Sequence, residues 1–236
     1  MTSPFLLYHK IDHPSPDAKV RGAFTPSRVF ERQLKFLLRK GTSFLSASDM
    51  VRHYLLNGSL PSRTVAVTFD DGWKDNYTNA FPLLKRYGIP ATIFIVPEML
   101  GKTSARVTAE GEGPREHMSV DDVREMSGAG IEFGSHSMSH ALLHQVSEDE
   151  ARREIFGSKA AIEEVLQKEC SVFAYPAGFF TVPVRQMVIE AGYIAGFSTV
   201  YGPEENTDLF ALNRTEVLRK DRLPFAFSHK VAPLVR

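Results

Sequence analysis

The sequence predicts an α/β fold built around a mostly parallel β-sheet. Short apolar runs alternate along the chain with longer segments in which apolar residues recur at helical spacing. Alternating strands and helices form βαβ units, whose short right-handed crossovers give either an open sheet or a barrel. The 236 residues allow one large domain, and single α/β barrels commonly reach this size.

Four strands are expected in the first hundred residues. The clearest, Val65–Phe69, is rich in β-branched residues and is followed at once by Asp70-Asp71-Gly72. Ala91–Val96 is apolar throughout, as is typical of a strand covered on both faces by helices. Phe5–Tyr8 and Phe44–Leu45 are the two weaker predictions.

Three helices are expected between these strands. Thr25 is a candidate N-cap with Pro26 at the first helical position, and Ser48 is a candidate N-cap for the second helix. Each helix ends next to a glycine, which commonly terminates helices. The expected helices cover residues 26–40, 48–57 and 79–87.

The second half of the chain continues the alternation after one interruption. Residues 101–117 are polar, contain glycine and lack periodicity, which predicts a long surface loop. Ser147-Glu-Asp-Glu150 reads as a capping box that opens a long helix. Further helices are expected at 119–127 and 183–191, and further strands at 131–133, 171–175, 193–199 and 210–212.

Composition and charge exclude several classes of protein. The 28 Lys and Arg balance 28 Asp and Glu, so no global field draws the chain to nucleic acid or anionic lipid, although a local patch is compatible with this sum. The single cysteine, Cys170, cannot form an internal disulfide. The longest apolar runs fall far short of the roughly 18 residues of a membrane helix.

The N-terminus shows no basic segment followed by a long apolar one. We therefore expect a cytoplasmic protein, or an extracytoplasmic one if the N-terminus is truncated.

The unusual polar residues follow predicted strands. The carboxyl ends of parallel strands meet at one edge of the sheet, where α/β folds assemble their sites, so these residues are expected to converge. They are His9, Asp70 and Asp71, His136 and His140, Pro176 to Gly178, and Arg214.

Two histidines and two aspartates among them have the chemistry of a metal site. His136 and His140 can bind one ion from one side if their segment takes a helical turn, and a carboxylate would complete a three-ligand site of the catalytic zinc type. One of Asp70 and Asp71 can bind the metal while the other faces its water, with a pKa that the neighbouring charge raises. The alternatives are solvated histidines and an Asx-turn or helix cap.

Three motifs in this order resemble the polysaccharide deacetylases of the NodB-homology type, carbohydrate esterase family 4. They are Thr68-Phe-Asp-Asp-Gly72, His136-Ser-Met-Ser-His140 and Tyr175-Pro-Ala-Gly178. Leu7-Tyr-His-Lys-Ile11 and Phe210-Ala-Leu-Asn-Arg214 are also similar to members that act on poly-N-acetylglucosamine and other exopolysaccharides. The resemblance implies an incomplete, distorted (β/α) barrel and a single catalytic domain over residues 1–236.

The resemblance also implies an activity, namely hydrolysis of the acetamide of an N-acetylated amino sugar in a polysaccharide or glycan precursor. The metal would be a divalent ion, usually Zn²⁺, and its bound water would have a pKa lowered to about 7. The family pattern assigns Asp70 as general base, Asp71, His136 and His140 as metal ligands, Ser137 as support of the histidine loop, Pro176 to Gly178 as a groove wall, and the Ala177 N–H as oxyanion donor.

The late motif departs from the family pattern. Many members have a Leu-x-His motif whose histidine is the general acid, whereas this chain has Leu212-Asn-Arg214. Arginine is always protonated and cannot transfer the proton. His9 is our candidate acid, with a structural or surface histidine as the alternative, and His144 is a weaker candidate.

A second departure concerns the base. The family arginine that normally pairs with it is missing from Ser171–Tyr175. We hypothesise that Arg214 supplies this ion pair to Asp70.

Aromatic residues near the motifs have two interpretations each. Trp73, Tyr8 and Tyr175 would stack on a sugar or pack against neighbouring loops, and Phe179-Phe180 would form an exposed lip or belong to the core. Overall neutrality favours an uncharged N-acetylated glycan as partner over a polyanion. Two rival functions are open: a deacylase or deformylase of a sugar-lipid or sugar-nucleotide precursor, and a catalytically silent carbohydrate-binding domain.

Overall fold

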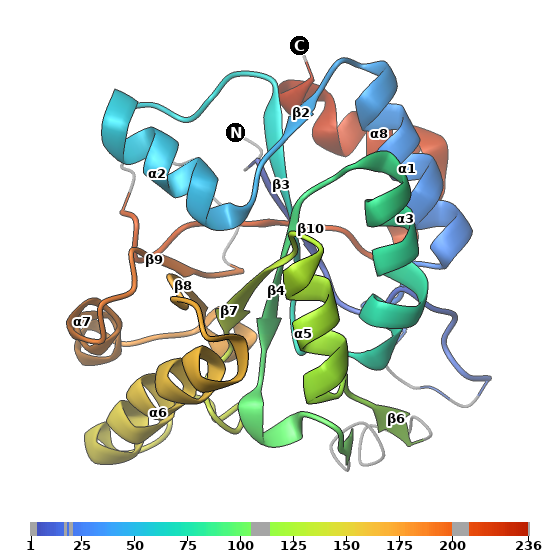
Figure 1. The fold of residues 1–236 in the computed structure, drawn as a ribbon. Helices are drawn as coiled ribbons and strands as arrows, with labels where there is room; N and C mark the ends of the chain where they lie inside the picture. Colours follow the sequence, from blue (N-terminus) through green and yellow to red (C-terminus); the bar gives the residue numbers. More distant parts are fainter. Residues whose placement is uncertain (1–3, 17, 19–20, 105–113, 200–207, 236) are drawn as a thin grey trace.

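The structure is a computed structural model that describes residues 4–16, 18, 21–104, 114–199 and 208–235 (Figure 1). Its main sheet has the strand order β10-β1-β3-β4-β7-β8-β9, with β2 paired to β3, and every ladder in it is parallel. The strands are β1 (Phe5–Tyr8), β2 (Ser43–Phe44), β3 (Thr64–Phe69), β4 (Ala91–Ile95), β7 (Glu132–Ser135), β8 (Val172–Ala174), β9 (Ala195–Phe197) and β10 (Thr215–Glu216).

The sheet curls into an incomplete barrel. Its two edges approach each other through one segment, in which Leu212 bridges Phe197 of β9 and Thr215 pairs with Leu6 of β1. Because this segment forms no continuous ladder, the ring is not fully closed. The α/β fold class and the distorted (β/α) barrel that the sequence predicts are therefore confirmed.

Seven α-helices are present in the described part of the chain, and most of them cover the outer face of the sheet (Figure 1). Their apolar faces join the strand residues in one large core outside the barrel. No described helix has the length and apolar character needed to cross a membrane. The helices are α1 (Ser27–Arg39), α2 (Ala47–Asn57), α3 (Phe81–Tyr87), α5 (Val120–Gly128), α6 (Glu148–Leu166), α7 (Val182–Glu190) and α8 (Pro224–Val231).

A second core fills the inside of the barrel. It contains Phe5, Ala66, Phe94 and Phe197 from the strands together with Met50 of α2. The start of α2 is hydrogen-bonded to Thr92 and Glu132 at the amino ends of β4 and β7, so α2 closes that end. The opposite end, where the strands finish, is left for the polar residues.

Several local predictions needed correction. The N-cap of α1 is Pro26 and not Thr25, and that of α2 is Ser46 and not Ser48. In the second case the Ser46 hydroxyl accepts the Asp49 N–H and therefore caps the helix two residues earlier than predicted. A short π-helix, η1 (Asn76–Ala80), directly precedes α3, so the helical segment predicted over 79–87 begins at Asn76, whereas α3 itself begins at Phe81.

The expected loop at 101–117 was wrong at both ends. β5 (Thr103–Ser104) and β6 (Arg115–Glu116) pair as antiparallel strands, and His117 is buried; residues 105–113 lie outside the described part. The expected strand 210–212 is reduced to the single bridge at Leu212, and the ladder with β1 starts only at Thr215.

Candidate active site

The polar residues predicted to converge do so in a cavity of about 220 Å³ at the carboxyl ends of the strands. Its lining comes mainly from the segments that follow β1, β3, β7, β8 and β9. The sequence-predicted residues that line it are His9, Asp70, Asp71, Trp73, His136, His140 and Ala177.

Asp71, His136 and His140 form a three-ligand cluster whose candidate ligand atoms all lie within 4.8 Å of one another. Asp71 Oδ1 lies 3.2 Å from His140 Nε2 and 3.7 Å from His136 Nε2. One carboxylate oxygen and two imidazole nitrogens are the donor set of catalytic zinc sites, which leave positions open for water or substrate. The cluster therefore fits a divalent metal, as the sequence predicts.

The protonation of His136 suits a metal ligand. Its Nδ1–H donates to the main-chain oxygen of Ala174 at 2.8 Å, which leaves the Nε2 lone pair facing Asp71. Burial lowers the pKa of His136 to about 4, even though Asp70 and Asp71 act to raise it. The ring is thus neutral at pH 7, the form that binds a metal.

Trp73 orients the ligand carboxylate. Its indole N–H donates to Asp71 Oδ2 at 2.9 Å, and its ring stacks on His117 with 4.2 Å between centroids. The Nδ1–H of His117 in turn donates to the main-chain oxygen of Asp71. Because Trp73 is only 1% exposed, packing is the correct interpretation and sugar stacking is wrong. Sequence reasoning missed His117, which it placed in a surface loop.

Asp70 is held by the expected ion pair with Arg214. The guanidinium makes two hydrogen bonds to the carboxylate, of 2.7 Å to Oδ1 and 2.6 Å to Oδ2, and both side chains are almost fully buried. A third bond, from Nε–H to the oxygen of Ser198, and the ring of Phe94 fix the arginine inside the barrel. Arg214 lies directly before β10 and not at the carboxyl end of a strand. Its long side chain brings the positive charge to Asp70.

The pKa values of Asp70 and Asp71 do not differ in the way the sequence predicts. Burial acts to raise the pKa of Asp70, but Arg214 and His136 outweigh it and the pKa lies below its usual range. Burial likewise acts to raise the pKa of Asp71, and the hydrogen bond and charge of His140 bring it well below that range. Both carboxyls are therefore ionised at neutral pH, because each has its own cationic or hydrogen-bonding partner.

The backbone around the cavity is strained. Asp71, Ser137, His140 and Ala177 have φ values of 73°, 62°, 67° and 57°, and they are four of the six non-glycine residues with positive φ in the described chain. The left-handed conformation costs roughly 1–2 kcal/mol for each such residue. The histidines therefore meet across an irregular loop, and the expected helical turn is wrong.

The supports of this loop differ from expectation. Glu154 of α6 accepts hydrogen bonds from the N–H and the hydroxyl of Ser139. The Ser137 hydroxyl is buried and has no hydrogen-bond partner among the described residues.

Only the middle residue of the third motif reaches the cavity. Ala177 lines the wall, whereas Pro176 and Gly178 are buried and are not part of the lining. A Cβ on Gly178 would lie 2.0 Å from Thr199 Oγ1, so only glycine fits there. The expected three-residue wall is thus reduced to one residue.

The neighbouring aromatic residues are mostly structural. Tyr175 is buried, donates its hydroxyl to the oxygen of Phe210 and stacks on Phe180, so it packs and does not stack on a sugar. Tyr8 is also buried and donates to Gln33. Phe179 is 56% exposed, so Phe179-Phe180 divides between an exposed ring and the core.

The candidate acids lie differently. His9 lines the cavity, and its Nδ1 is buried without a hydrogen-bond partner in the part of the chain described. His144 is outside the lining, next to Gln145 and Phe179. Lys10, which the sequence did not single out, lines the cavity with its ammonium over the rings of Phe24 and Trp73.

A family model described as polysaccharide deacetylase matches residues 57–196. The chain is 30% identical over 196 residues to the poly-β-1,6-N-acetyl-D-glucosamine N-deacetylase of Staphylococcus aureus strain MSSA476, covering 78% of this chain and 64% of that protein's length. It is 28% identical over 215 residues to YxkH of Bacillus subtilis strain 168, covering 91% and 71% of the two chains.

Two solved structures have the same fold as this chain. The deacetylase PplD of Streptococcus pyogenes in complex with acetate has a TM-score of 0.80 at 27% identity, covering 100% of this chain and 99% of that one. IcaB of Ammonifex degensii shares the fold with a TM-score of 0.80 at 23% identity, covering 98% and 95%.

The chain belongs to the polysaccharide deacetylase family. Enzymes of this class are hydrolases of carbon–nitrogen bonds other than peptide bonds, and both the predicted family and the predicted enzyme class are confirmed.

We expect Trp73→Phe to weaken metal binding. The change removes the donor to Asp71 Oδ2 and keeps most of the ring packing, and loss of such an outer partner typically costs about 10–100-fold in metal affinity. Affinity for Zn²⁺ is measured by competition with a chelator. Tyr77→Phe, which removes an exposed hydrogen bond to Glu125, is the control. Equal affinities for the two variants would contradict the assigned role.

Arg214→Met should destabilise the fold far more than Arg214→Met combined with Asp70→Asn. Breaking a buried pair costs about 3–5 kcal/mol because one charge stays buried and unpaired, and the double change removes that charge. The free energy of unfolding is measured in urea. Arg185→Met breaks the partly exposed Arg185–Asp208 pair, and should cost about 1 kcal/mol or less.

The pH dependence of this pair has a defined sign. Because the pKa of Asp70 is lowered in the folded state, the ionised carboxylate contributes its full stabilisation of the fold above about pH 4, the usual carboxyl pKa, and this contribution is lost as the pH falls further.

The double variant decides the ion-pair account. If Arg214→Met combined with Asp70→Asn is as unstable as Arg214→Met alone, the account is refuted.

Proposed function

We propose that this protein is a metal-dependent N-deacetylase that hydrolyses the acetamide of an N-acetylated amino sugar in a polysaccharide or glycan precursor. The observation that carries the proposal is the placement of Asp71, His136 and His140 beside the arginine-paired Asp70 in one cavity. Two relatives support it: the S. aureus protein is a poly-N-acetylglucosamine N-deacetylase by name, and PplD is a deacetylase that was solved with acetate.

Asp71, His136 and His140 would hold the metal, with Zn²⁺ as our choice from the donor set. When bound, it would supply Lewis-acid chemistry, acidifying water and polarising the acetamide carbonyl.

Asp70 is the general base in this proposal. Arg214 fixes its orientation and keeps it ionised, and its Oδ2 lies 3.9 Å from His136 Nε2. A water that attacks the carbonyl carbon from the metal side can therefore transfer a proton to Asp70.

Ala177 contributes through its main chain. It stands at the cavity wall with a left-handed backbone, and we assign its N–H as the donor to the oxygen that becomes negatively charged. Such a donor is typically worth about 10²–10³ in kcat. A methyl side chain suffices there because only the N–H takes part.

His9 is our choice for the general acid. The carbon–nitrogen bond breaks to give acetate and a sugar amine, and the departing nitrogen must take up a proton. Arg214 is fully charged and occupied by Asp70, whereas His9 lines the cavity and lies close enough for its charge to lower the pKa of both aspartates. It is the remaining histidine in the cavity lining once the two metal ligands are assigned.

Acetate release tests the function. The Zn²⁺-loaded protein should release acetate from chito-oligosaccharides, poly-N-acetylglucosamine or precursor glycolipids, and the substrate with the highest kcat/KM identifies the glycan class. Asp70→Asn should lower kcat at least 100-fold with metal still bound, since general base catalysis contributes about 10²–10⁴-fold. Asp208→Asn, at the carboxylate of the partly exposed Arg185–Asp208 pair, should leave kcat unchanged. Bound metal without turnover on any of these would support the silent binding domain instead.

The role of His9 has a sharper test. His9→Ala should slow acetamide hydrolysis and spare hydrolysis of 4-nitrophenyl acetate, because nitrophenolate departs without a proton. Asp70→Asn should slow both reactions. If His9→Ala lowers both rates equally, or neither, His9 is not the acid.

A further inference from the structure

A second cavity, of about 640 Å³, opens at the start of α1. Its polar lining consists of Arg28, Arg219 and Arg222 with His13 and Ser27, and no described carboxylate lines it. Two of the arginines come from the 3₁₀-helix η4 (Arg219–Arg222) and one from α1. We call it the arginine cavity. The deacetylation chemistry derived above gives it no role.

The positive charge of this cavity is not neutralised within the described chain. Arg28, Arg219 and Arg222 take part in none of its salt bridges. The carboxylates nearest to these arginines along the sequence are engaged elsewhere: Glu31 with Lys35 and Arg86, and Asp221 with Lys230. The three guanidinium groups therefore give this cavity a local excess of positive charge.

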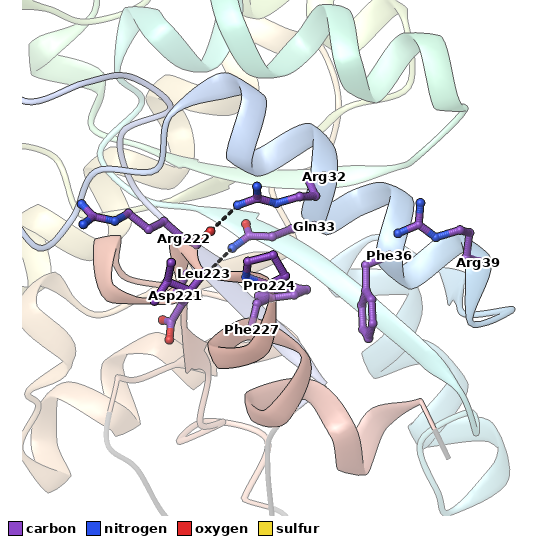
Figure 2. Close-up of a pocket in the computed structure, with 9 residues that line it drawn as sticks. All are labelled: Arg32, Gln33, Phe36, Arg39, Asp221, Arg222, Leu223, Pro224 and Phe227. Atoms are coloured by element: carbon purple, nitrogen blue, oxygen red, sulfur yellow. Dashed lines mark hydrogen bonds between the residues drawn. The ribbon is translucent and has the colours of Figure 1, made fainter.

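The main chain that carries these arginines is fastened in place. The N–H of Arg219 donates to Gly22 at 2.8 Å, and Arg32 and Gln33 of α1 donate to the main-chain oxygens of Arg222 and Asp221. Figure 2 shows these two bonds beside a small cavity of about 80 Å³ between α1 and the segment from η4 to α8, which Arg222 also lines. That small cavity contains none of the predicted site residues.

The arginine cavity adjoins the catalytic cavity. One segment supplies Lys10 to the catalytic cavity and His13 to the arginine cavity, and another supplies Ala23 and Pro26 in the same way. The two segments are hydrogen-bonded to each other at Lys10. Three residues span at most about 11 Å, so the Cα atoms of Lys10 and His13 are no farther apart than that. Neighbouring parts of the same two segments therefore line both cavities.

We propose that the arginine cavity binds an anionic group, a carboxylate or a phosphate, on the same glycan whose acetamide occupies the catalytic cavity. Guanidinium groups bind both anions through paired N–H donors, and a concave cationic site concentrates them. The proposal rests on the proposed function and names its substrate class as an anionic or anion-substituted glycan. The overall charge of zero, which favours a neutral glycan, reports only a sum and hides this local excess.

An anionic bilayer is the competing explanation. Leu223 and Phe225, directly after Arg222, are 60% and 80% exposed, and basic groups beside exposed apolar side chains are typical of membrane-surface contacts. The concave shape and the lining segments shared with the catalytic cavity favour the glycan.

The test compares three N-acetylglucosamine oligomers of equal length: a neutral one, one with O-succinyl groups and one with O-phosphoryl groups. Their dissociation constants are measured by calorimetry for the wild-type chain and for Arg28→Gln/Arg219→Gln/Arg222→Gln. The wild type should bind at least one anionic oligomer tenfold or more tighter than the neutral one, and the triple variant should bind all three equally. The control Arg39→Gln, at the far end of α1, should keep the preference.

Equal binding of all three oligomers by the wild type, or a preference retained by the triple variant, would overturn the proposal. A third outcome would also overturn it: the wild type sediments with phosphatidylglycerol vesicles, the triple variant does not, and the wild type shows no preference among the oligomers. That outcome would identify an anionic bilayer as the ligand. Arg28→Gln alone, at an exposed position, should give a partial loss of preference and covers the case in which the triple variant does not fold. Acetate release is measured separately. A preference for anionic oligomers without release of acetate would refute the proposed function but not the anion-binding role of the arginine cavity.

Discussion

The site depends on one buried ion pair. Arg214 and Asp70 are 144 residues apart in sequence and meet inside the barrel with almost no exposure to water. Taking two charges out of water costs several kcal/mol per ion and is offset only by good geometry, here two short hydrogen bonds and a third from the arginine to Ser198. The arginine reaches Asp70 only because the segment from Leu212 to Thr215 joins β9 to β1. The segment that links the two edges of the incomplete barrel therefore also carries the counter-ion that keeps the base ionised.

Strain around the cavity shows how firmly the rest of the fold holds it. Asp71, Ser137, His140 and Ala177 all occupy the left-handed region, which side chains other than glycine disfavour. Such residues persist where the surroundings over-determine them, and they gather at functional sites. Here the surroundings are the core on both faces of the sheet and the specific bonds from Trp73, Glu154 and His117. These contacts hold the metal-ligand candidates in their positions.

The overall charge of zero conceals a separation of charged groups between two cavities. Carboxylates and imidazoles occupy the catalytic cavity, whereas arginines from two distant parts of the chain line the adjoining one. The two environments share the segment from His9 to His13, which joins the candidate acid to the rim of the arginine cavity. A substrate that spans both would be recognised at its acetamide by the metal site and at a second group by charge, two chemistries that act independently.

Sequence patterns determined the features that depend on local order. Apolar periodicity was enough for the parallel α/β class, and the three motifs, through their resemblance to a known family, were enough for the barrel and the family. The strand-end positions of Asp70, Asp71, His136 and His140 were enough to predict that they meet, because parallel strands bring their carboxyl ends together. Only the tertiary structure decided which way side chains point. Trp73 turns its N–H to Asp71, Pro176 is buried outside the lining of the cavity, and Arg28 lines a second cavity together with Arg219 and Arg222. These outcomes follow from backbone angles and long-range packing, which periodicity along the chain does not encode.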